Sequence, residues 1–305
     1  MTKLLQTLVS ALSIGSLYAL IALGYTLVYG VLRFINFAHS DVVTLGTWLT
    51  VTIAGAFGWS KLSPVFALPV VLLLTMAACA LVGITLEYFA YRPLRRAPRL
   101  NVLITAIGVS LFLQNFGQLK WVFGPNYASS PALLVDRTLF EVAGVAIRLV
   151  DVVIIVLAVV LVLGLELLVF RTKLGRGMRA VSFDERIASL MGVNVNRVVT
   201  ITFGIGSALA AAGGLIYTLK YSKIGQTAEV GWVLLGLKAF IAAVVGGIGN
   251  VRGAAMGALL IAGVEQFGAA YLSPKLQDVY VFLVLIAVLL WKPSGLLGRA
   301  VTEKV

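Results

Sequence analysis

The sequence predicts an all-α fold, a polytopic helical transmembrane bundle. Of its 305 residues, 60% are apolar and only 12% are charged, whereas soluble domains contain about 25% charged residues. The apolar residues form repeated continuous runs close to the about 20 residues that a helix needs to cross a bilayer. A transmembrane barrel would instead require strands of about ten residues that alternate apolar and polar side chains. The continuous apolar runs of this sequence argue against a barrel.

Nine apolar segments predict eight or nine membrane crossings. Two polar or glycine-rich stretches, 33–46 and 246–252, interrupt the pattern and are expected to form broken or re-entrant segments. If 33–46 is a half-helix, the side of the N-terminus changes, so both placements stay open. We expect one transmembrane domain over 1–305, with spans at 4–31, 42–59, 64–90, 102–122, 152–170, 198–219, 232–248, 254–271 and 279–291.

Positive charge is concentrated in short connections between the apolar segments. The positive-inside rule therefore predicts that these connections, and a C-terminus with Lys292, Arg299 and Lys304, lie in the cytoplasm. The net charge of +12 is explained by this topology, and no basic stripe with interleaved aromatic residues indicates nucleic-acid binding. The two clusters are Arg92, Arg95, Arg96 and Arg99, and then Arg171, Lys173, Arg176, Arg179, Arg186 and Arg197.

The residues needed for catalysis or metal binding are scarce. Cys79 is the only cysteine and His39 the only histidine, so we expect neither a disulfide nor a metal site. Glu87, Glu166 and Glu265 are scattered, which does not assemble an intramembrane enzyme. A phosphate-binding loop of the form G-x-x-x-x-G-K-[ST] is also missing from the sequence. We therefore predict a non-enzymatic chain that binds no cofactor itself.

A short amphipathic helix is predicted at 182–191, between two apolar segments. Ser182 and Glu185 have the spacing of a capping box, and Gly192 suits the C-terminal end. Four apolar side chains fall on one face, and three charged side chains point elsewhere. Such a helix docks a partner or lies on the membrane or its own bundle. The apolar residues are Phe183, Ile187, Leu190 and Met191, and the charged ones are Asp184, Glu185 and Arg186.

This segment resembles the cytoplasmic coupling helix of ABC importer permeases, in the family that transports branched-chain amino acids. The family pattern G-R-x-x-R-A-x-x-x-D-x-x-x-A-x-x-x-G is matched at all seven of its specified positions. Further motifs follow the family's order along nearly the whole chain. Lys292 and Ser40 depart mildly from the pattern. The seven matches are Gly175, Arg176, Arg179, Ala180, Asp184, Ala188 and Gly192, and the other motifs lie at 35–39, 92–94, 105–108, 237–240, 246–249 and 292–296.

The resemblance implies a permease of the LivH type in a bacterial inner membrane. It implies import of leucine, isoleucine and valine by alternating access, with two cytoplasmic ATPase subunits that bind ATP and magnesium. A second, related permease and a periplasmic binding protein are the other expected partners, besides membrane lipid. Urea or short amides are an alternative cargo, and a self-sufficient channel or secondary transporter is an alternative function. The residues expected to couple to the ATPase are Arg179, Ser182, Phe183, Asp184, Glu185, Arg186, Ile187, Ala188, Leu190, Met191 and Gly192.

Polar residues within or beside the apolar segments are candidates for the translocation path or its gate. Lys238 and Glu265 each lie about six residues from the outer end of an antiparallel span, which makes an ion pair between them geometrically possible, and we take this pair as a hypothesis. This pair either gates the path or only clamps two helices together. Asn36, Phe37, His39 and Asp41 lie in the interrupted segment, where they either border the path or cap helix ends.

Overall fold

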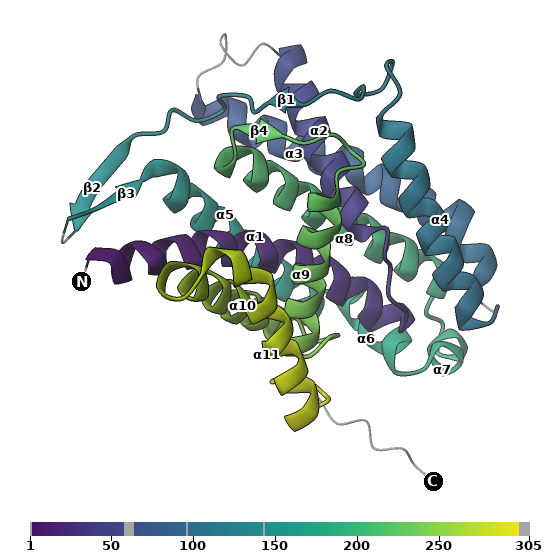
Figure 1. The fold of residues 1–305 in the computed structure, drawn as a ribbon. Coiled ribbons are helices and arrows are strands. Elements are labelled where there is room, and N and C mark those ends of the chain that lie inside the picture. The colour runs from purple at the N-terminus through teal and green to yellow at the C-terminus, as the bar shows by residue number, and fades with distance from the viewer. Residues whose placement is uncertain (1, 58–63, 96, 143, 299–305) are drawn as a thin grey trace.

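The computed structural model describes residues 2–57, 64–95, 97–142 and 144–298. Each of the nine predicted spans is a helix, and the expected bundle is confirmed (Figure 1). The spans are α1 (Thr2–Leu32), α2 (His39–Phe57), α3 (Pro64–Leu86), α4 (Arg99–Gly117), α5 (Leu149–Arg171), α8 (Val195–Lys220), α9 (Val230–Gly246), α10 (Val251–Tyr271) and α11 (Gln277–Trp291).

Shorter elements connect these helices. A π-helical turn, η2 (Glu87–Tyr91), and a 3₁₀ turn, η3 (Arg92–Leu94), follow α3, and η4 (Pro274–Leu276) precedes α11. Strands β2 (Thr138–Val142) and β3 (Val145–Arg148) form an antiparallel hairpin, and β1 (Ala128–Ser129) pairs with β4 (Lys223–Ile224). The remaining helices, α6 (Lys173–Phe183) and α7 (Glu185–Leu190), lie between α5 and α8.

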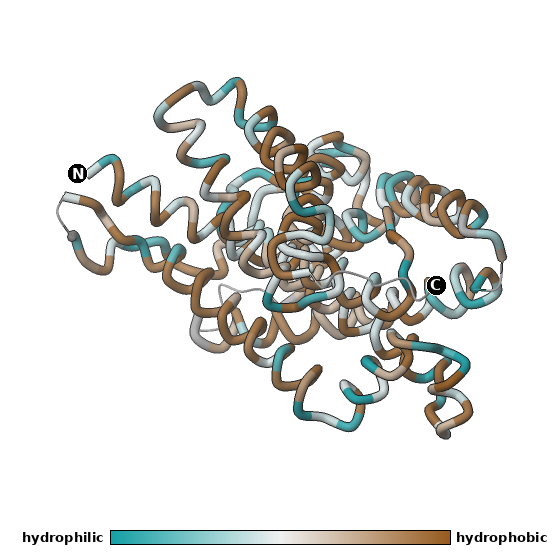
Figure 2. The backbone as a smooth tube through the Cα atoms, turned by 90° about the horizontal axis from the view of Figure 1, so that it is seen from below, coloured by the Kyte–Doolittle hydropathy of each residue, from teal (hydrophilic) through white to brown (hydrophobic). Residues whose placement is uncertain are grey.

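Length and hydropathy make this a multi-pass membrane protein. In the described part of the chain, seven helices are long and apolar enough to cross a membrane, and α9 is a shorter apolar helix. Hydrophobic residues predominate along the long helices, and many hydrophilic residues lie at helix ends and connections (Figure 2). The expected eight or nine spans therefore fit the structure approximately, with seven long apolar helices and the shorter α9 in the described residues.

Helices α1 and α8 form the core of the bundle. Helix α1 packs against α10, α8, α5 and α9, while α8 packs against α3 and α2. Small residues allow these helices to pack closely. A Cβ atom at Gly257 would overlap the backbone of α9, and one at Gly214 would overlap the backbone of α2. Helices α3, α5 and α11 expose many apolar side chains, as expected for surfaces that face lipid.

The bundle has two ends, which we call the basic face and the hairpin face. The basic face carries α6, α7 and the turn with Arg92 and Arg95, and the hairpin face carries β2 and β3. Helix α1 joins the two faces, because Thr2 lies beside the hairpin residue Gly144 and Arg33 bonds to α6. The last described residues return to the basic face, where Leu297 N–H donates to Gly246 O at 3.0 Å. The two termini of the described chain therefore lie at opposite faces.

The interrupted segment 33–38 turns back into the bundle, but α2 continues as one helix over His39–Phe57. The stretch 33–46 is therefore not a half-helix, and the side of the N-terminus expected for nine full crossings is kept. Helix α2 begins at His39, which packs on Gly24 of α1 and on the Tyr25 ring, with centroids 4.5 Å apart. Gly24 lies two turns before the end of α1, so α2 starts inside the bundle and continues toward the hairpin face. The second interruption is a tight turn, in which Gly247 and Gly249 have φ values of 107° and 91°.

Candidate functional site

The predicted docking helix is in fact two helices that meet at Asp184. This residue has an extended backbone, with φ −155° and ψ 118°, and its side chain accepts a hydrogen bond from Ile187 N–H at 2.8 Å. It therefore caps α7, a role for which aspartate is favoured. The predicted capping box is wrong, because Ser182 lies near the end of α6 and donates its hydroxyl to Arg179 O at 2.8 Å.

The C-terminal end of α7 agrees with the sequence prediction. Gly192 has a φ of 82°, a left-handed conformation that favours glycine. Val193 N–H donates to Ala188 O at 3.0 Å, and Met191 N–H donates to Ile187 O at 3.0 Å. These bonds close the helix before α8 begins.

Four apolar side chains at the end of α6 and along α7 point away from the bundle, whereas Met178 and Val181 of α6 are buried. The exposed fraction is 81% for Phe183, 86% for Leu190 and 79% for Met191, and it is 53% for Ile187, whereas Ala188 is only 3% exposed. The segment therefore rests on the bundle through Ala188 and presents its larger apolar side chains outward. Exposed apolar patches of this kind mark protein or membrane contacts.

The first half of the family pattern builds the corner between α5 and α6. Gly175 lies against the last carbonyls of α5, and a Cβ atom there would overlap the Val169 carbonyl oxygen. The Arg179 guanidinium donates to this same carbonyl and lies over the Phe170 ring at 5.5 Å. These contacts couple the orientation of α6 to the end of α5, so Arg179 is engaged within the chain itself.

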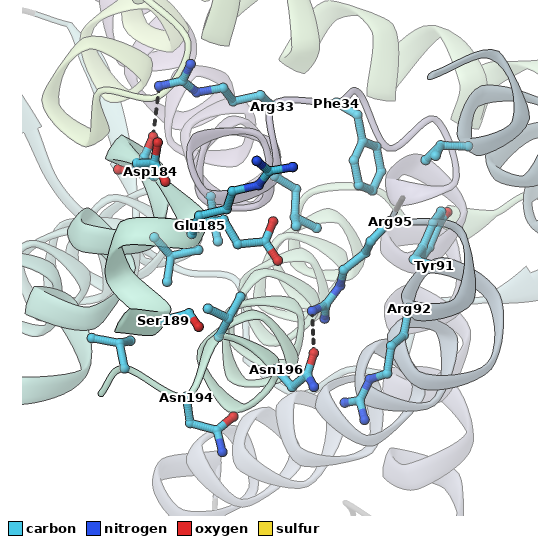
Figure 3. A pocket seen from close by; sticks show the side chains of 18 of the residues that line it. Arg33, Phe34, Tyr91, Arg92, Arg95, Asp184, Glu185, Ser189, Asn194 and Asn196 are labelled. Atoms are coloured by element: carbon cyan, nitrogen blue, oxygen red, sulfur yellow. Dashed lines mark hydrogen bonds between the residues drawn. The ribbon is translucent and has the colours of Figure 1, made fainter. Parts of the chain in front are cut away.

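A cavity of about 1320 Å³ opens at the basic face beside α7. Figure 3 shows Arg95, Tyr91 and Arg92 on one side, with Asp184 and Glu185 on the other. Its walls thus come from the ends of α1 and α6, from η2 and η3, and from the connection between α7 and α8. The lining residues used below are Arg33, Tyr91, Arg92, Arg95, Asp184 and Asn196.

A buried ion cluster behind this cavity was missed by the sequence analysis. Glu87, with a fully buried side chain, is ion-paired with Arg92 at 3.0 Å and with Arg95. Thr200 of α8 donates to Glu87 at 2.6 Å, and Arg95 donates to Asn196 at 2.7 Å (Figure 3). Glu87 begins the π-helical turn η2, and such turns are frequent at functional sites. The cluster fastens the α3 end to α8.

Arg33 connects the interrupted segment 33–38 to the docking segment formed by α6 and α7. Its Nη2 donates to Ser182 O at 2.9 Å, so a cation caps the C-terminal end of α6, where the helix dipole favours positive charge. Arg33 also has a φ of 54°, uncommon for a non-glycine residue. This contact joins the end of α6 to the segment that precedes α2.

Three of the predicted path residues are buried around the start of α2. Asn36 Oδ1 accepts from the Tyr91 hydroxyl at 2.6 Å and from Ala38 N–H at 3.2 Å. His39 packs between α1 and α8 beside Gly24, and Asp41 accepts from Gln114 of α4 at 2.8 Å. Phe37, by contrast, is 39% exposed.

The expected Lys238–Glu265 ion pair forms, at 2.7 Å. Two further partners join it that sequence spacing did not indicate. Lys238 also lies 2.6 Å from Asp278 of α11, and the Tyr18 hydroxyl of α1 donates to Glu265 at 2.7 Å. The cluster therefore ties α1, α9, α10 and α11 together.

These features define a class: a multi-pass helical membrane protein with an outward-facing docking segment at one face and ionic clusters buried between its helices. The family follows from comparison with known sequences. A family model described as branched-chain amino acid transport system / permease component matches residues 7–289, and the chain belongs to this family.

Two curated relatives extend over nearly the whole chain. The branched-chain amino acid permease protein BraD of Pseudomonas aeruginosa is 40% identical, covering 99% of this chain and 98% of that protein. The permease protein LivH of Escherichia coli K12 is 37% identical, covering 99% and 97%. Among solved structures, PsaBC from Streptococcus pneumoniae in complex with Fab aligns with a TM-score of 0.45 and 11% identity, covering 95% of this chain and 91% of that one.

Proposed function

We propose that this chain is the membrane-spanning subunit of an ABC importer for branched-chain amino acids. The observation that carries the proposal is the exposed apolar face of α6 and α7, formed by Phe183, Ile187, Leu190 and Met191. In a chain of this permease family, such a face fits the groove of a cytoplasmic ATPase subunit. Asp184, Glu185 and Arg186 then supply polar contacts around the apolar centre.

The basic face is the cytoplasmic face in this proposal. Arginines of both sequence clusters lie there, in short connections that the positive-inside rule places in the cytoplasm. The described C-terminal residues lie at the same face, so the C-terminus is cytoplasmic and Thr2 lies outside. The membrane in this proposal is the inner membrane of a bacterium, because the relatives BraD and LivH come from bacteria.

The complete importer needs other subunits. The sequence has no phosphate-binding loop of the ATPase type, so ATP and magnesium bind to two separate ATPase subunits. A second, related permease completes the pore, and a periplasmic binding protein delivers leucine, isoleucine or valine. The cofactors of the complex are thus held by its partners.

The contacts in this chain supply a route from the ATPase to the membrane. When the ATPase dimer closes on ATP, it moves α7. Arg179 passes this movement to α5, and Arg33 passes it to the segment that precedes α2. Rocking of the helices then changes the side to which the cavity opens. Asn36, Phe37, His39 and Asp41 are the residues that border the path, whereas Lys238 and Glu265, the other candidates for a gate, clamp the helices beside it.

Uptake by the purified complex tests this function. The chain, a second permease, the two ATPases and the binding protein are reconstituted in liposomes, and labelled leucine is offered with and without ATP inside. We expect leucine uptake only with ATP. Equal uptake without ATP would support a channel or secondary transporter. ATP-driven uptake of urea or acetamide, without leucine uptake, would identify the alternative cargo.

A further inference from the structure

Asp41 has an incompletely satisfied carboxylate in the interior of the bundle. The residue is 3% exposed, and its Oδ1 accepts from Gln114 Nε2 at 2.8 Å. Its Oδ2 is buried without a hydrogen-bond partner among the described residues. The threonines of α2 are different, because each donates its hydroxyl to the carbonyl four residues earlier. These threonines are Thr44, Thr47, Thr50 and Thr52.

The position of Asp41 makes this incomplete pairing costly. It lies in the first turn of α2, which starts inside the bundle beside Gly24. A carboxylate at such depth is normally paired with a cation or marks the route of a substrate. In the described part of the chain, no lysine, arginine or histidine forms an ion pair with Asp41. The site therefore lacks a cationic partner.

A small cavity adjoins Asp41. It measures about 10 Å³ and is lined by Asp41, Thr44, Gln114, Gly117 and Thr227, with apolar neighbours. This volume admits about one water-sized group. A larger molecule reaches Asp41 only if the wall that α4 forms moves away.

Helix α4 is only loosely attached to the bundle. Its principal described helix contacts are with α2 and with the turn η2. Near the hairpin-face end, Thr227 also donates to Gln114 O at 2.7 Å. Much of the helix surface is open, because Leu100 is 63% exposed and Phe112 is 59% exposed. Separation of α4 from α2 therefore breaks few contacts and uncovers Asp41.

We propose that Asp41 binds the α-ammonium group of the passing amino acid, which replaces Gln114 on the carboxylate when α4 moves away from α2. An ammonium group has three donors and a positive charge, so its hydrogen bonds to a carboxylate are stronger than those of the neutral Gln114 amide. Without cargo, the Gln114 bond closes α4 onto α2. The inference rests on the proposed function for its cargo only.

Uptake per ATP hydrolysed separates this role from a structural one. The complete complex is reconstituted with Asp41→Asn, Asp41→Glu or the control Glu166→Gln, which removes a carboxylate that pairs with Arg252 far from α2 and α4. We expect Asp41→Asn to lower leucine uptake per ATP by about tenfold or more, with ATPase stimulation by the loaded binding protein retained. Asp41→Glu and Glu166→Gln should stay within about threefold.

An unchanged ratio in Asp41→Asn overturns the inference, and so does an equal loss in Asp41→Glu. If the wild-type complex takes up no leucine at all, the proposed function fails instead, whatever the variants do. The two failures are therefore distinguishable.

A cross-link tests the movement of α4 with Asp41 and Gln114 intact. Leu45 and Leu113 lie on facing sides of the small cavity, and Cys79 is the only native cysteine. In a Cys79→Ala background, Leu45→Cys and Leu113→Cys are joined by a short bifunctional thiol reagent that can be cleaved by reduction. We expect uptake to stop and to return after reduction. Undiminished uptake by the cross-linked complex overturns the proposed opening. This test holds even if the Asp41→Asn complex fails to assemble.

Discussion

Two of the buried ion clusters in the described part of the chain differ in what surrounds them. Lys238, Glu265 and Asp278 join three helices near the hairpin face, and Tyr18 adds a fourth. Glu87, Arg92 and Arg95 join the α3 end to α8 at the basic face. The first cluster lies outside the large cavity, whereas Arg92 and Arg95 line it. We infer that the first cluster is a clamp and that the second is a junction able to rearrange.

The largest effect on stability should come from breaking the clamp. Glu265→Gln leaves Lys238 with Asp278 alone and weakens the Tyr18 bond, so we expect a loss of about 3–5 kcal/mol, as when one partner of a buried pair is removed. Thermal unfolding in lipid nanodiscs measures this loss. Glu166→Gln, in a pair whose arginine side chain is 69% exposed, should cost less than about 1 kcal/mol. Equal losses would contradict the assignment of the clamp.

The junction should respond differently. Glu87→Gln removes the charge that Arg92 and Arg95 share, but it retains an acceptor, and Arg92 has water access through a side chain that is 30% exposed. We expect a loss of about 1.5–3 kcal/mol in the same unfolding assay. Leucine uptake per ATP should fall in this variant but not in a Glu265→Gln complex that is kept below its unfolding temperature. If leucine uptake per ATP falls in Glu265→Gln and not in Glu87→Gln, the assignment of clamp and junction is contradicted.

A smaller effect tests the cap of α7. Asp184→Ala removes the acceptor for Ile187 N–H, which should cost about 1 kcal/mol of local helix stability. Hydrogen exchange of the amides in 186–191 should then become faster. Ser182→Ala is the matched control, since its hydroxyl bonds within α6. Faster exchange in Ser182→Ala alone would restore the capping box that the sequence suggested.

The smallest expected effect on stability concerns Arg33. Arg33→Ala removes the bond to Ser182 O and leaves both clusters intact. We expect coupling between ATP hydrolysis and leucine uptake to weaken by about 0.5–2 kcal/mol, with the unfolding temperature unchanged. If the ratio of uptake to hydrolysis equals that of the wild type, the route through Arg33 is contradicted.

Periodicity and residue spacing were sufficient for much of the fold. All nine spans were expected from apolar runs, and the Lys238–Glu265 pair followed from equal depth on two neighbouring antiparallel helices. The outward direction of Leu190 and Met191 agrees with the single apolar face that the spacing in 182–191 predicted. These features depend on local pattern or on elements adjacent in sequence.

Other features depend on contacts between distant segments. The Glu87 cluster needs Thr200 of α8, more than a hundred residues away, and only a glutamate ahead of two arginines hinted at it. Asp278 lies at a span end, where a charged residue is unremarkable in sequence. Ser182 and Asp184 are both good capping residues, and the extended backbone at Asp184 decides between them. The Asp41–Gln114 contact requires the packing of α4 on α2, which no motif encodes.

Co-purification from native membranes tests the central claim most directly, namely that the exposed α6–α7 segment binds the ATPase. The wild-type chain and a variant with Asp184→Ala, Glu185→Ala and Arg186→Ala are purified, and mass spectrometry identifies the bound proteins. We predict that the wild type retains two ATPase subunits and a second permease, and that the variant keeps the permease but loses the ATPases. A wild-type chain that purifies alone, or a variant with unchanged ATPase content, would contradict this claim.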